Sequence, residues 1–330
     1  MERIASVLVS LVLFIGPYGA LAADKLLGVH SARVMSQSMP WIAAEAGLFR
    51  RYDLEFPLVY ISSSPLATAA ILGGDGELLM DGGLGIVRAY VQGNTELICI
   101  GGQKNILTQS ILAKSPIKKL EDLRSKKVGV TRIGATTHYF ATQAFRKVGM
   151  EAGRDYTMIQ TGGAPEMLAA LISGAIEAGT LSPPFDAQAL SQGFQYVVYG
   201  PDLRIPQVAV GFMTRRSTLT KRPQVLGRFM RVMAEAAKIL HTDKEFTFKV
   251  LSKQLRLNDR KTLEFGYNEE IKVLEPRLTI RPEAFQAILD DVAQTDPRAR
   301  KVMPEDFIDR RFLDEMTKSG FFDKLWGERS

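Results

Sequence analysis

Short apolar runs alternate with amphipathic segments from about residue 24 to about residue 200, and this alternation leaves few folds open to the chain. Each apolar run has the length of a buried strand, and each amphipathic segment of about 8 to 12 residues has the length of a helix. Strands that alternate with such helices predict βαβ crossovers and largely parallel sheets. The alternation falls into two series, so the sequence predicts an α/β fold with two lobes.

The expected strands share a short apolar core and cover residues 26–29, 58–61, 78–80 and 97–100 in the first series, and 128–130, 158–159, 178–181 and 196–198 in the second, which also has a strand near Ile111. The expected helices between them cover residues 40–46, 65–72, 85–91, 137–148, 165–173 and 185–190.

The pattern becomes helical after about Arg215. Between Val225 and Leu240 the apolar residues fall on one helical face with a period of about 3.6 residues. Further helices are expected over residues 244–254, 260–271, 282–293 and 312–326. Such a mostly helical C-terminal third is expected to cover one of the sheets.

The N-terminus has the pattern of a secretory signal peptide, residues 1–23. An apolar run over residues 4–15 ends at Gly16-Pro17, and small residues follow at positions 20 and 22. The run is shorter than the roughly 20 residues that a membrane-spanning helix needs. We therefore expect cleavage near Ala22 or Ala23 and a periplasmic mature chain; an uncleaved anchor is the alternative.

Composition excludes several classes of function. The single cysteine, Cys99, cannot form a disulfide within the chain, and no cysteine stands at the expected mature N-terminus to carry a lipid. The net charge of +6 suits an anionic ligand, but no basic run is dense enough for nucleic acid. The three histidines lie far apart, and no metal, nucleophile, phosphate-loop or dinucleotide motif is present. We expect no catalytic residues, no metal and no cofactor.

Small and hydroxyl residues gather at six joints between a strand and the following helix. A helix start offers free N–H donors and the positive end of the helix dipole. In an open parallel sheet these joints meet at the carboxyl edge, where polar or anionic ligands bind. Ordinary caps and turns are the alternative. The joints read Ser36-Gln37-Ser38-Met39-Pro40, Ser62-Ser63-Ser64-Pro65, Asp81-Gly82-Gly83-Leu84-Gly85, Gly134-Ala135-Thr136-Thr137, Gly162-Gly163-Ala164-Pro165 and Ser182-Pro183-Pro184.

Five single residues in or near these joints are further candidates, and most of them have an alternative structural interpretation. Asp81 could act as a base or merely shape a turn, and His138 could face a ligand from a helix start. Arg33 and Arg132 follow strands and could pair with a carboxylate or sulfonate, or could be solvated. Trp41 could line a cleft or pack in the core.

Several segments resemble the NMT1/THI5-like family, the SsuA/TauA-type solute-binding proteins of ABC importers. Together these segments span nearly all of the mature chain in the order of the family. They are Pro40-Trp41-Ile42-Ala43-Ala44-Glu45-Ala46-Gly47-Leu48-Phe49, Leu120-Glu121-Asp122-Leu123 with Lys126-Lys127-Val128-Gly129-Val130, Gly162-Gly163 with residues 169–178, and Phe312-Leu313 with Ser319-Gly320-Phe321.

The resemblance implies a type II periplasmic binding fold, in which two α/β lobes joined by two crossing strands close on a solute by a hinge motion. The crossings would fall near residues 102–109 and 201–208. Residues 24–105 would then begin the first lobe, residues 106–205 would form the second, and residues 206–330 would return to the first with a strand and the C-terminal helices.

The resemblance also implies ligand contacts, by position, at joints of both lobes. They are Ser36, Gln37, Ser38, Ser62, Ser63, Ser64 and Gly83 in the first lobe, and Thr136, Thr137 and Ser182 in the second. Where the family often has Gly-Ser-x-x-Asp, this chain has His138 in place of the carboxylate. We add His138 as a candidate contact that would favour an acidic ligand.

The expected function is capture of a small polar or anionic organic solute and its delivery to an ABC permease in the inner membrane, by a monomer without enzymatic activity. Sulfonates, nitrate-like anions, pyrimidines and aromatic or carboxylic acids are the candidate ligands. One alternative is a sensor that docks on a membrane receptor. The other is an enzyme like the thiamine-pyrimidine synthases, whose iron-binding cysteine-rich stretch is missing here.

Overall fold

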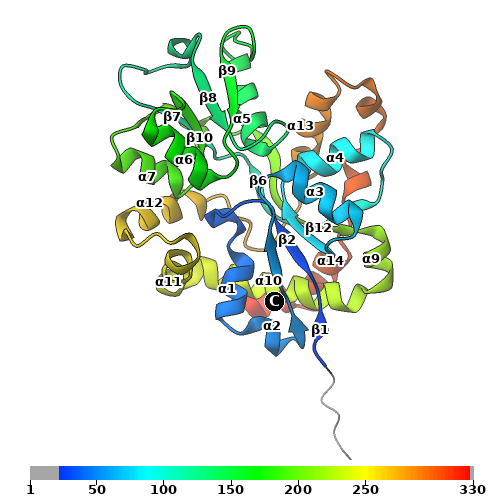
Figure 1. Cartoon of the computed structure of the whole chain (residues 1–330). Helices are drawn as coiled ribbons and strands as arrows, with labels where there is room; N and C mark the ends of the chain where they lie inside the picture. Colours follow the sequence, from blue (N-terminus) through cyan, green and yellow to red (C-terminus); the bar gives the residue numbers. More distant parts are fainter. Residues whose placement is uncertain (1–21, 328–330) are drawn as a thin grey trace, which may run out of the picture.

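Two five-stranded sheets organise the molecule (Figure 1). The computed structural model describes residues 22–327. Nearly all of the expected signal peptide lies outside the described residues, so its cleavage near Ala22 or Ala23 stays a prediction. Within residues 22–327, no helix is long and apolar enough to cross a membrane.

The first sheet has the strand order β4-β2-β5-β12-β6. Its strands β2, β4 and β5 are parallel, while β12 runs antiparallel to both β5 and β6. A separate parallel pair, β1 with β3, lies nearby in the sequence. The bounds are β1 (Asp24–Lys25), β2 (Gly28–His30), β3 (Leu54–Glu55), β4 (Leu58–Tyr60), β5 (Leu78–Asp81), β6 (Leu97–Ile106) and β12 (Pro206–Arg215).

The second sheet has the order β11-β7-β10-β8-β9. Here β8 is parallel to β9 and β10, and β7 is antiparallel to β10 and β11. The sheet and its helices form the upper left part of Figure 1. The bounds are β7 (Ser110–Ala113), β8 (Lys127–Val130), β9 (Thr157–Gln160), β10 (Ala178–Leu181) and β11 (Gln195–Val198).

Both sheets are mixed, so the expectation of largely parallel sheets holds only for strands that a helix connects. The strands β7 and β12 each enter their sheet directly from the other sheet. Without a helical crossover on the same sheet, nothing requires them to run parallel to their neighbours. A pattern of alternating elements cannot reveal such a connection.

The helices of the two series begin and end where local chemistry allows. Pro65 and Pro165 stand in the first turns of α3 and α6, where a missing N–H costs nothing. Gly74 and Gly174 end the same helices at φ values of 94° and 78°, which favour glycine. The bounds are η1 (Met35–Gln37), α1 (Met39–Glu45), α2 (Leu48–Arg51), α3 (Ser64–Gly73), α4 (Gly83–Val91), η2 (Leu120–Leu123), α5 (Thr136–Arg146), α6 (Ala164–Ser173), α7 (Phe185–Ser191) and α8 (Gly200–Leu203).

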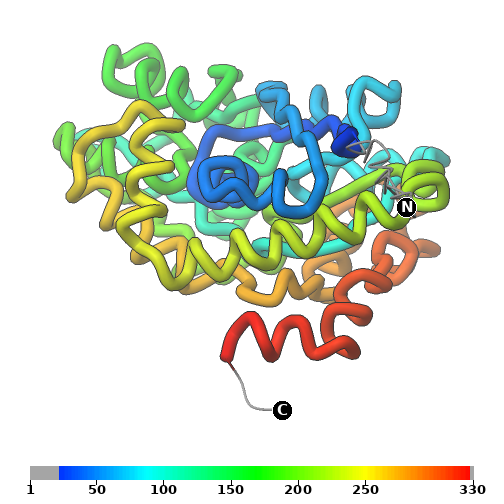
Figure 2. The backbone as a smooth tube through the Cα atoms, turned by 90° about the horizontal axis from the view of Figure 1, so that it is seen from below, coloured from blue at the N-terminus to red at the C-terminus, as the bar shows by residue number. Residues whose placement is uncertain are grey.

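The C-terminal helices cover the first sheet, as expected. Phe229 of α10 packs on Phe212 of β12 with ring centroids 5.7 Å apart. Figure 2 shows α10 in yellow-green running across the molecule, with the last helices in red along one edge. The bounds are α9 (Arg216–Lys221), α10 (Pro223–Thr242), α11 (Lys244–Leu255), α12 (Arg260–Glu270), α13 (Pro282–Val292), η3 (Pro297–Lys301), η4 (Pro304–Phe307), α14 (Arg311–Lys318) and α15 (Phe321–Trp326).

The chain passes from the first sheet to the second at residues 107–109 and returns at residues 199–205. Strand β6 continues to Ile106, beyond the expected end at Ile100, because it pairs along its length with β12. We call the two connections together with the ends of β6 and β12 the hinge region, and a buried ion pair lies in it: Lys104 Nζ on β6 is 2.7 Å from Glu270 Oε1 at the end of α12, and both side chains are 1% exposed. The two connections lie at or next to the crossings that the resemblance implies.

Candidate functional site

A narrow cavity of about 60 Å³ lies between the two sheets, at the carboxyl ends of their parallel strands. This is the edge where open α/β sheets bind ligands. Both lobes contribute to its wall. The lining residues are Ser31, Ala32, Val34, Ser36, Gln37, Tyr60, Ser63, Ser64, Asp81, Ala209 and Val210 on the first-sheet side, and Gln109, Thr131, Ala135, Thr136, Thr137, Gly162, Gly163, Ala164, Thr180 and Ser182 on the second-sheet side.

Most of the contacts that the sequence predicts line this cavity, namely Ser36, Gln37, Ser63, Ser64, Thr136, Thr137 and Ser182. The others lie outside the lining. Ser38 is fully buried at the start of α1, and Gly83 packs against Ile288 and Val208. Ser62, the first residue of its joint, and His138, which follows the joint that ends at Thr137, are partly buried. The roles of these residues as ligand contacts stay predictions.

Asp81 is the centre of the first-lobe wall. It ends β5 in the middle of the sheet, is 1% exposed, and its Oδ1 accepts hydrogen bonds from Ser31 Oγ (2.6 Å) and Ser64 Oγ (2.8 Å). Burial raises the pKa of Asp81 to about 6, against the opposing effect of these hydroxyls and the Gly82 N–H. Its Oδ2 is buried and has no hydrogen-bond partner. A turn at a strand end, the plain interpretation of this residue, does not explain that arrangement.

Gln37 fixes the same wall from the short helix η1. Its Nε2 donates to Ser31 Oγ at 3.1 Å, and its Oε1 accepts from the Ala32 N–H at 3.0 Å. Because the Ser31 hydroxyl donates to Asp81, the amide, hydroxyl and carboxylate form one chain of hydrogen bonds. This chain holds three lining side chains in defined orientations.

Ser63 adopts a strained backbone conformation at the second joint. Its φ of 81° and ψ of 144° lie in a region that favours glycine, and its N–H donates to the Ser31 carbonyl at 3.2 Å. Its Oγ is buried without a partner and lies in the cavity wall. Strain of this kind persists where the surroundings enforce it and is common at ligand sites.

The second-lobe wall offers mainly hydroxyls and backbone N–H groups. The hydroxyls of Thr131 and Thr137 lie 2.8 Å apart, and the Thr131 N–H donates to Thr137 Oγ1 at 3.0 Å. The helices α5 and α6 both begin at this wall, where their first N–H groups lack helical partners. Thr180 Oγ1 and Gln109 Oε1 are buried and unpartnered here.

Charge is sparse in the cavity: among its lining residues, Asp81 is the one whose side chain carries a formal charge. The two arginines that the sequence suggests as partners of a carboxylate or sulfonate do not line it. The guanidinium carbon of Arg33 lies over the Tyr60 ring, 4.7 Å from its centroid. Arg132 follows Thr131 but is also outside the lining.

The two lobes touch across the cleft at a contact that we call the latch, formed by Gln143, Arg146 and Asp291. Gln143 Nε2 and Arg146 Nη1 on α5 donate to Asp291 Oδ1 on α13 at 2.7 and 2.9 Å. His138 lies near the latch, where burial and then Arg88 lower its pKa while Asp291 raises it. The latch therefore connects the two lobes directly through side chains of α5 and α13.

Three other residues with possible chemistry lie in the core. Trp41 is 8% exposed and packs edge-on against His30, with ring centroids 5.6 Å apart. Burial lowers the pKa of His30 to about 4, and it raises the pKa of the fully buried Cys99 thiol to about 12. Within residues 22–327, no group of three His, Cys, Asp or Glu side chains could hold a metal ion.

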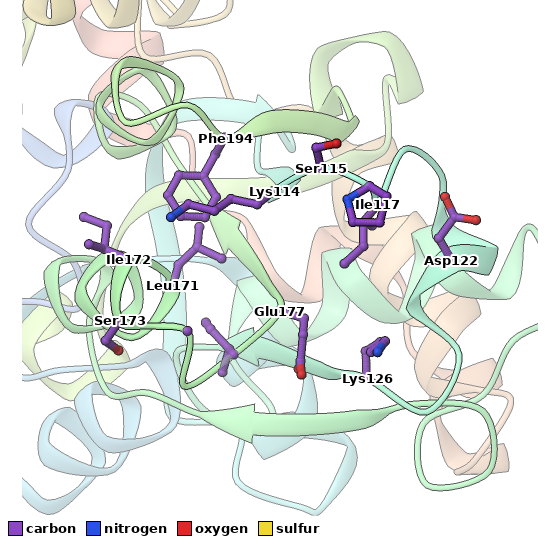
Figure 3. A pocket seen from close by; sticks show the side chains of 13 residues that line it. Lys114, Ser115, Ile117, Asp122, Lys126, Leu171, Ile172, Ser173, Glu177 and Phe194 are labelled. Atoms are coloured by element: carbon purple, nitrogen blue, oxygen red, sulfur yellow. The ribbon is translucent and has the colours of Figure 1, made fainter.

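A larger cavity of about 760 Å³ lies at the opposite edge of the second sheet (Figure 3). Its wall includes Lys114, Lys126 and Phe194, which stand at the ends of β7, β8 and β11 that face away from the cleft. Because ligands of open sheets bind at the carboxyl ends of parallel strands, the smaller cavity is the candidate functional site.

Sequence reasoning missed several lining residues, namely Ser31, Tyr60, Gln109, Thr131 and Thr180. Ser31, Tyr60, Thr131 and Thr180 stand at or next to the carboxyl ends of strands, before the joints that carry the small-residue signal, and Gln109 lies in the connection from β6 to β7. Their positions in the wall depend on strand order, which the sequence does not show. Polar residues at strand ends are the feature of the sequence that could have identified these positions.

Comparisons with known proteins agree with this architecture. A family model described as NMT1-like family matches residues 32–252. No curated protein matches the sequence. The periplasmic binding protein fold that the resemblance implies is confirmed by solved structures of low sequence identity.

Three of these structures are informative. A protein from Bordetella bronchiseptica RB50 is 17% identical, with a TM-score of 0.81 over 89% of this chain and 97% of that one. The alkanesulfonate-binding protein SsuA from Xanthomonas axonopodis pv. citri, bound to MOPS, is 18% identical, with a TM-score of 0.72 over 87% and 98%. A DszB variant in complex with biphenyl-2-sulfinic acid is 13% identical, with a TM-score of 0.67 over 90% and 99%.

Proposed function

Because the chain belongs to the NMT1-like family, we propose that it is the periplasmic solute-binding component of an ABC importer. It captures a small polar or anionic organic solute between its lobes and delivers it to a permease in the inner membrane. It acts as a monomer without chemical conversion of the solute.

One observation carries this proposal: polar atoms from both lobes meet, buried and unpartnered, around a single cavity. Ser63 Oγ and Asp81 Oδ2 come from the first-lobe wall, and Gln109 Oε1 and Thr180 Oγ1 from the second. An unsatisfied buried polar atom costs about 1–3 kcal/mol. A solute that pairs with atoms of both walls removes that cost only when the lobes are closed, which couples binding to hinge closure.

The same cavity gives little support to an enzyme. The Cys99 thiol lies in the core, donates to the Gly101 carbonyl at 3.3 Å and is absent from the cavity lining. The imidazole of His30 is also outside the lining. Since DszB shares the fold, measured turnover and not the fold decides between a binding protein and an enzyme.

A thermal-shift screen of small organic solutes on the mature chain, followed by X-ray scattering, tests the proposal. A solute at 100 times its dissociation constant should stabilise the protein by about 2.7 kcal/mol. We expect the radius of gyration to fall with the same solute, and mass spectrometry to recover the solute unchanged. Conversion of the solute to a product would refute the proposal, and uptake into proteoliposomes with the cognate permease would separate an importer from a sensor.

Two threonine variants make the screen specific to the cavity. Thr180 and Thr247 are both buried, and the Oγ1 of each has no partner, but only Thr180 lines the cavity. Thr180→Val should weaken binding about tenfold if one hydrogen bond to the solute is lost. Thr247→Val is the matched control and should bind as the wild type does.

A further inference from the structure

Only one of the two oxygens of the Asp81 carboxylate accepts hydrogen bonds from side chains of the protein. Its Oδ1 receives both the Ser31 and the Ser64 hydroxyl hydrogens, while Oδ2 is buried without a partner in a residue that lines the cavity. The residue is 1% exposed, so this oxygen is shielded from bulk solvent. An ionised carboxylate oxygen only accepts hydrogen bonds, so Oδ2 favours a hydrogen-bond donor on a molecule bound in the cavity.

The oxygens of the neighbouring Ser31 and Ser64 hydroxyls also act as hydrogen-bond acceptors. Ser31 and Ser64 direct their hydrogens to Asp81, which leaves oxygen lone pairs toward their other neighbours. One lone pair of Ser31 Oγ is taken by Gln37 Nε2. The first-lobe wall is thus rich in acceptors, with a carboxylate at its centre.

No basic side chain lines the cavity to offset this carboxylate. An anion held about 4 Å from an ionised Asp81 would be repelled by about 4 kcal/mol at an effective dielectric constant of about 20. A protonated nitrogen in the same place would gain a similar energy before its own desolvation is counted. The electrostatics of the first-lobe wall therefore favour a nitrogen donor over an acidic group.

We propose that the solute carries an N–H donor group, as in an amine, an amidine or an amino-substituted heterocycle, and that this group binds Asp81 Oδ2. This inference rests on the proposed solute-binding function and specifies its ligand class. A carbonyl or anionic group elsewhere on the same solute lies toward the second-lobe wall, where the N-termini of α5 and α6 supply N–H donors.

Three matched pairs of probes test the proposal on the mature wild-type chain. They are propylamine with propanesulfonate, acetamidine with acetate, and aminopyrimidine with pyrimidine; in each pair only the first member has an N–H donor. We expect the donor member of at least one pair to raise the melting temperature more than its partner does. A larger shift with the acceptor-only members, or no shift with any probe, would overturn the assignment.

The variant Asp81→Asn tests the residue itself, because its amide replaces one acceptor by a donor at nearly constant volume. Binding of the successful donor probe should weaken at least tenfold, whereas Asp186→Asn should leave it unchanged. Asp186 is the matched control, since it is 2% exposed but both of its oxygens have partners and it does not line the cavity. Equal binding by wild type and Asp81→Asn would refute the role of Asp81.

The outcomes also separate this inference from the proposed function. If propanesulfonate or acetate binds, closes the lobes and is recovered unchanged, the chain is a solute-binding protein and the donor assignment is wrong. If a donor probe binds Asp81 but is converted to product, the assignment stands and the binding-protein function fails. The wild-type comparison needs no substitution, so it decides the question even if Asp81→Asn does not fold.

Discussion

Replacement of Asp81 by Asn should make the protein more stable at neutral pH, although it removes a side chain from the site. The pKa of Asp81 rises from 3.8 to about 6 on folding because the carboxylate is buried. This difference corresponds to roughly 3 kcal/mol at pH values above both pKa values. Asn has no charge to bury, but its amide nitrogen would take the unpartnered position, at a cost of about 1 kcal/mol. We expect a net gain of about 2 kcal/mol in the free energy of unfolding at about pH 8.

The sign of the pH dependence follows from the same pKa. Between about pH 4 and pH 6 the folded chain keeps the Asp81 proton more often than the unfolded chain does. The wild type should therefore lose stability as pH rises through this window and stay at the lower value above it. At about pH 4 the linkage contribution falls to about 0.5 kcal/mol, so the cost of the unpartnered amide should cancel or slightly exceed the stabilising effect of Asp81→Asn.

Urea unfolding followed by circular dichroism at about pH 4 and about pH 8 measures this difference for both proteins. Asp155→Asn is the control of opposite sign, because the Glu151 N–H and the Arg154 guanidinium lower the pKa of Asp155 to about 2. A stability difference between wild type and Asp81→Asn that is the same at both pH values would refute the reasoning. It would show that Asp81 is not held in the environment described here.

Three further predictions concern the hinge, the latch and the strained joint. Lys104→Met should lower the free energy of unfolding, measured by urea titration, by about 3–5 kcal/mol, because Glu270 is left buried without its partner. The double variant with Glu270→Leu should recover most of this loss. No recovery in the double variant would argue against the ion pair as the cause. Asp291→Ala should shift the lobes toward an open form, with the ratio of open to closed molecules rising about fivefold for each kcal/mol of lost latch contact. X-ray scattering should then give a larger radius of gyration. An unchanged radius would count against the latch. Ser63→Gly should raise the free energy of unfolding by about 1 kcal/mol, because φ is 81° at this position, but it should weaken solute binding. A lower free energy of unfolding in this variant would mean that the joint is unstrained.

The sequence predicts the local elements of this fold well because their signals are local. The proline and glycine positions that bound α3 and α6 act through the φ values of single residues, and they can be read without a structure. The same holds for the apolar face of α10, whose residues Phe229 and Leu240 are fully buried. Segment type and order are therefore largely set by nearest neighbours in the chain.

The length of β6 and the direction of β12 could not be predicted from local signals of this kind. Strand β6 reaches Ile106 only because β12, about a hundred residues later in the sequence, pairs with it. No local pattern in the sequence marks Lys104 as buried, but it is 1% exposed and paired with Glu270. Both features depend on a partner that is distant along the chain, so no local pattern reports them.

The candidate site shows the same division. Small and hydroxyl residues at helix starts are a local property, and Ser63, Ser64 and Thr136, which stand at such starts, line the cavity; that they contact a ligand stays a prediction. The sequence by itself thus determined the order of strands and helices, the chemistry of the joints and the family. Only the tertiary structure decided that Asp81 is buried between two serine hydroxyls with one oxygen free and no lining cation to balance it. The physical reason is that burial and electrostatic balance depend on groups brought together from distant parts of the chain, whereas helix starts and turns depend on adjacent residues.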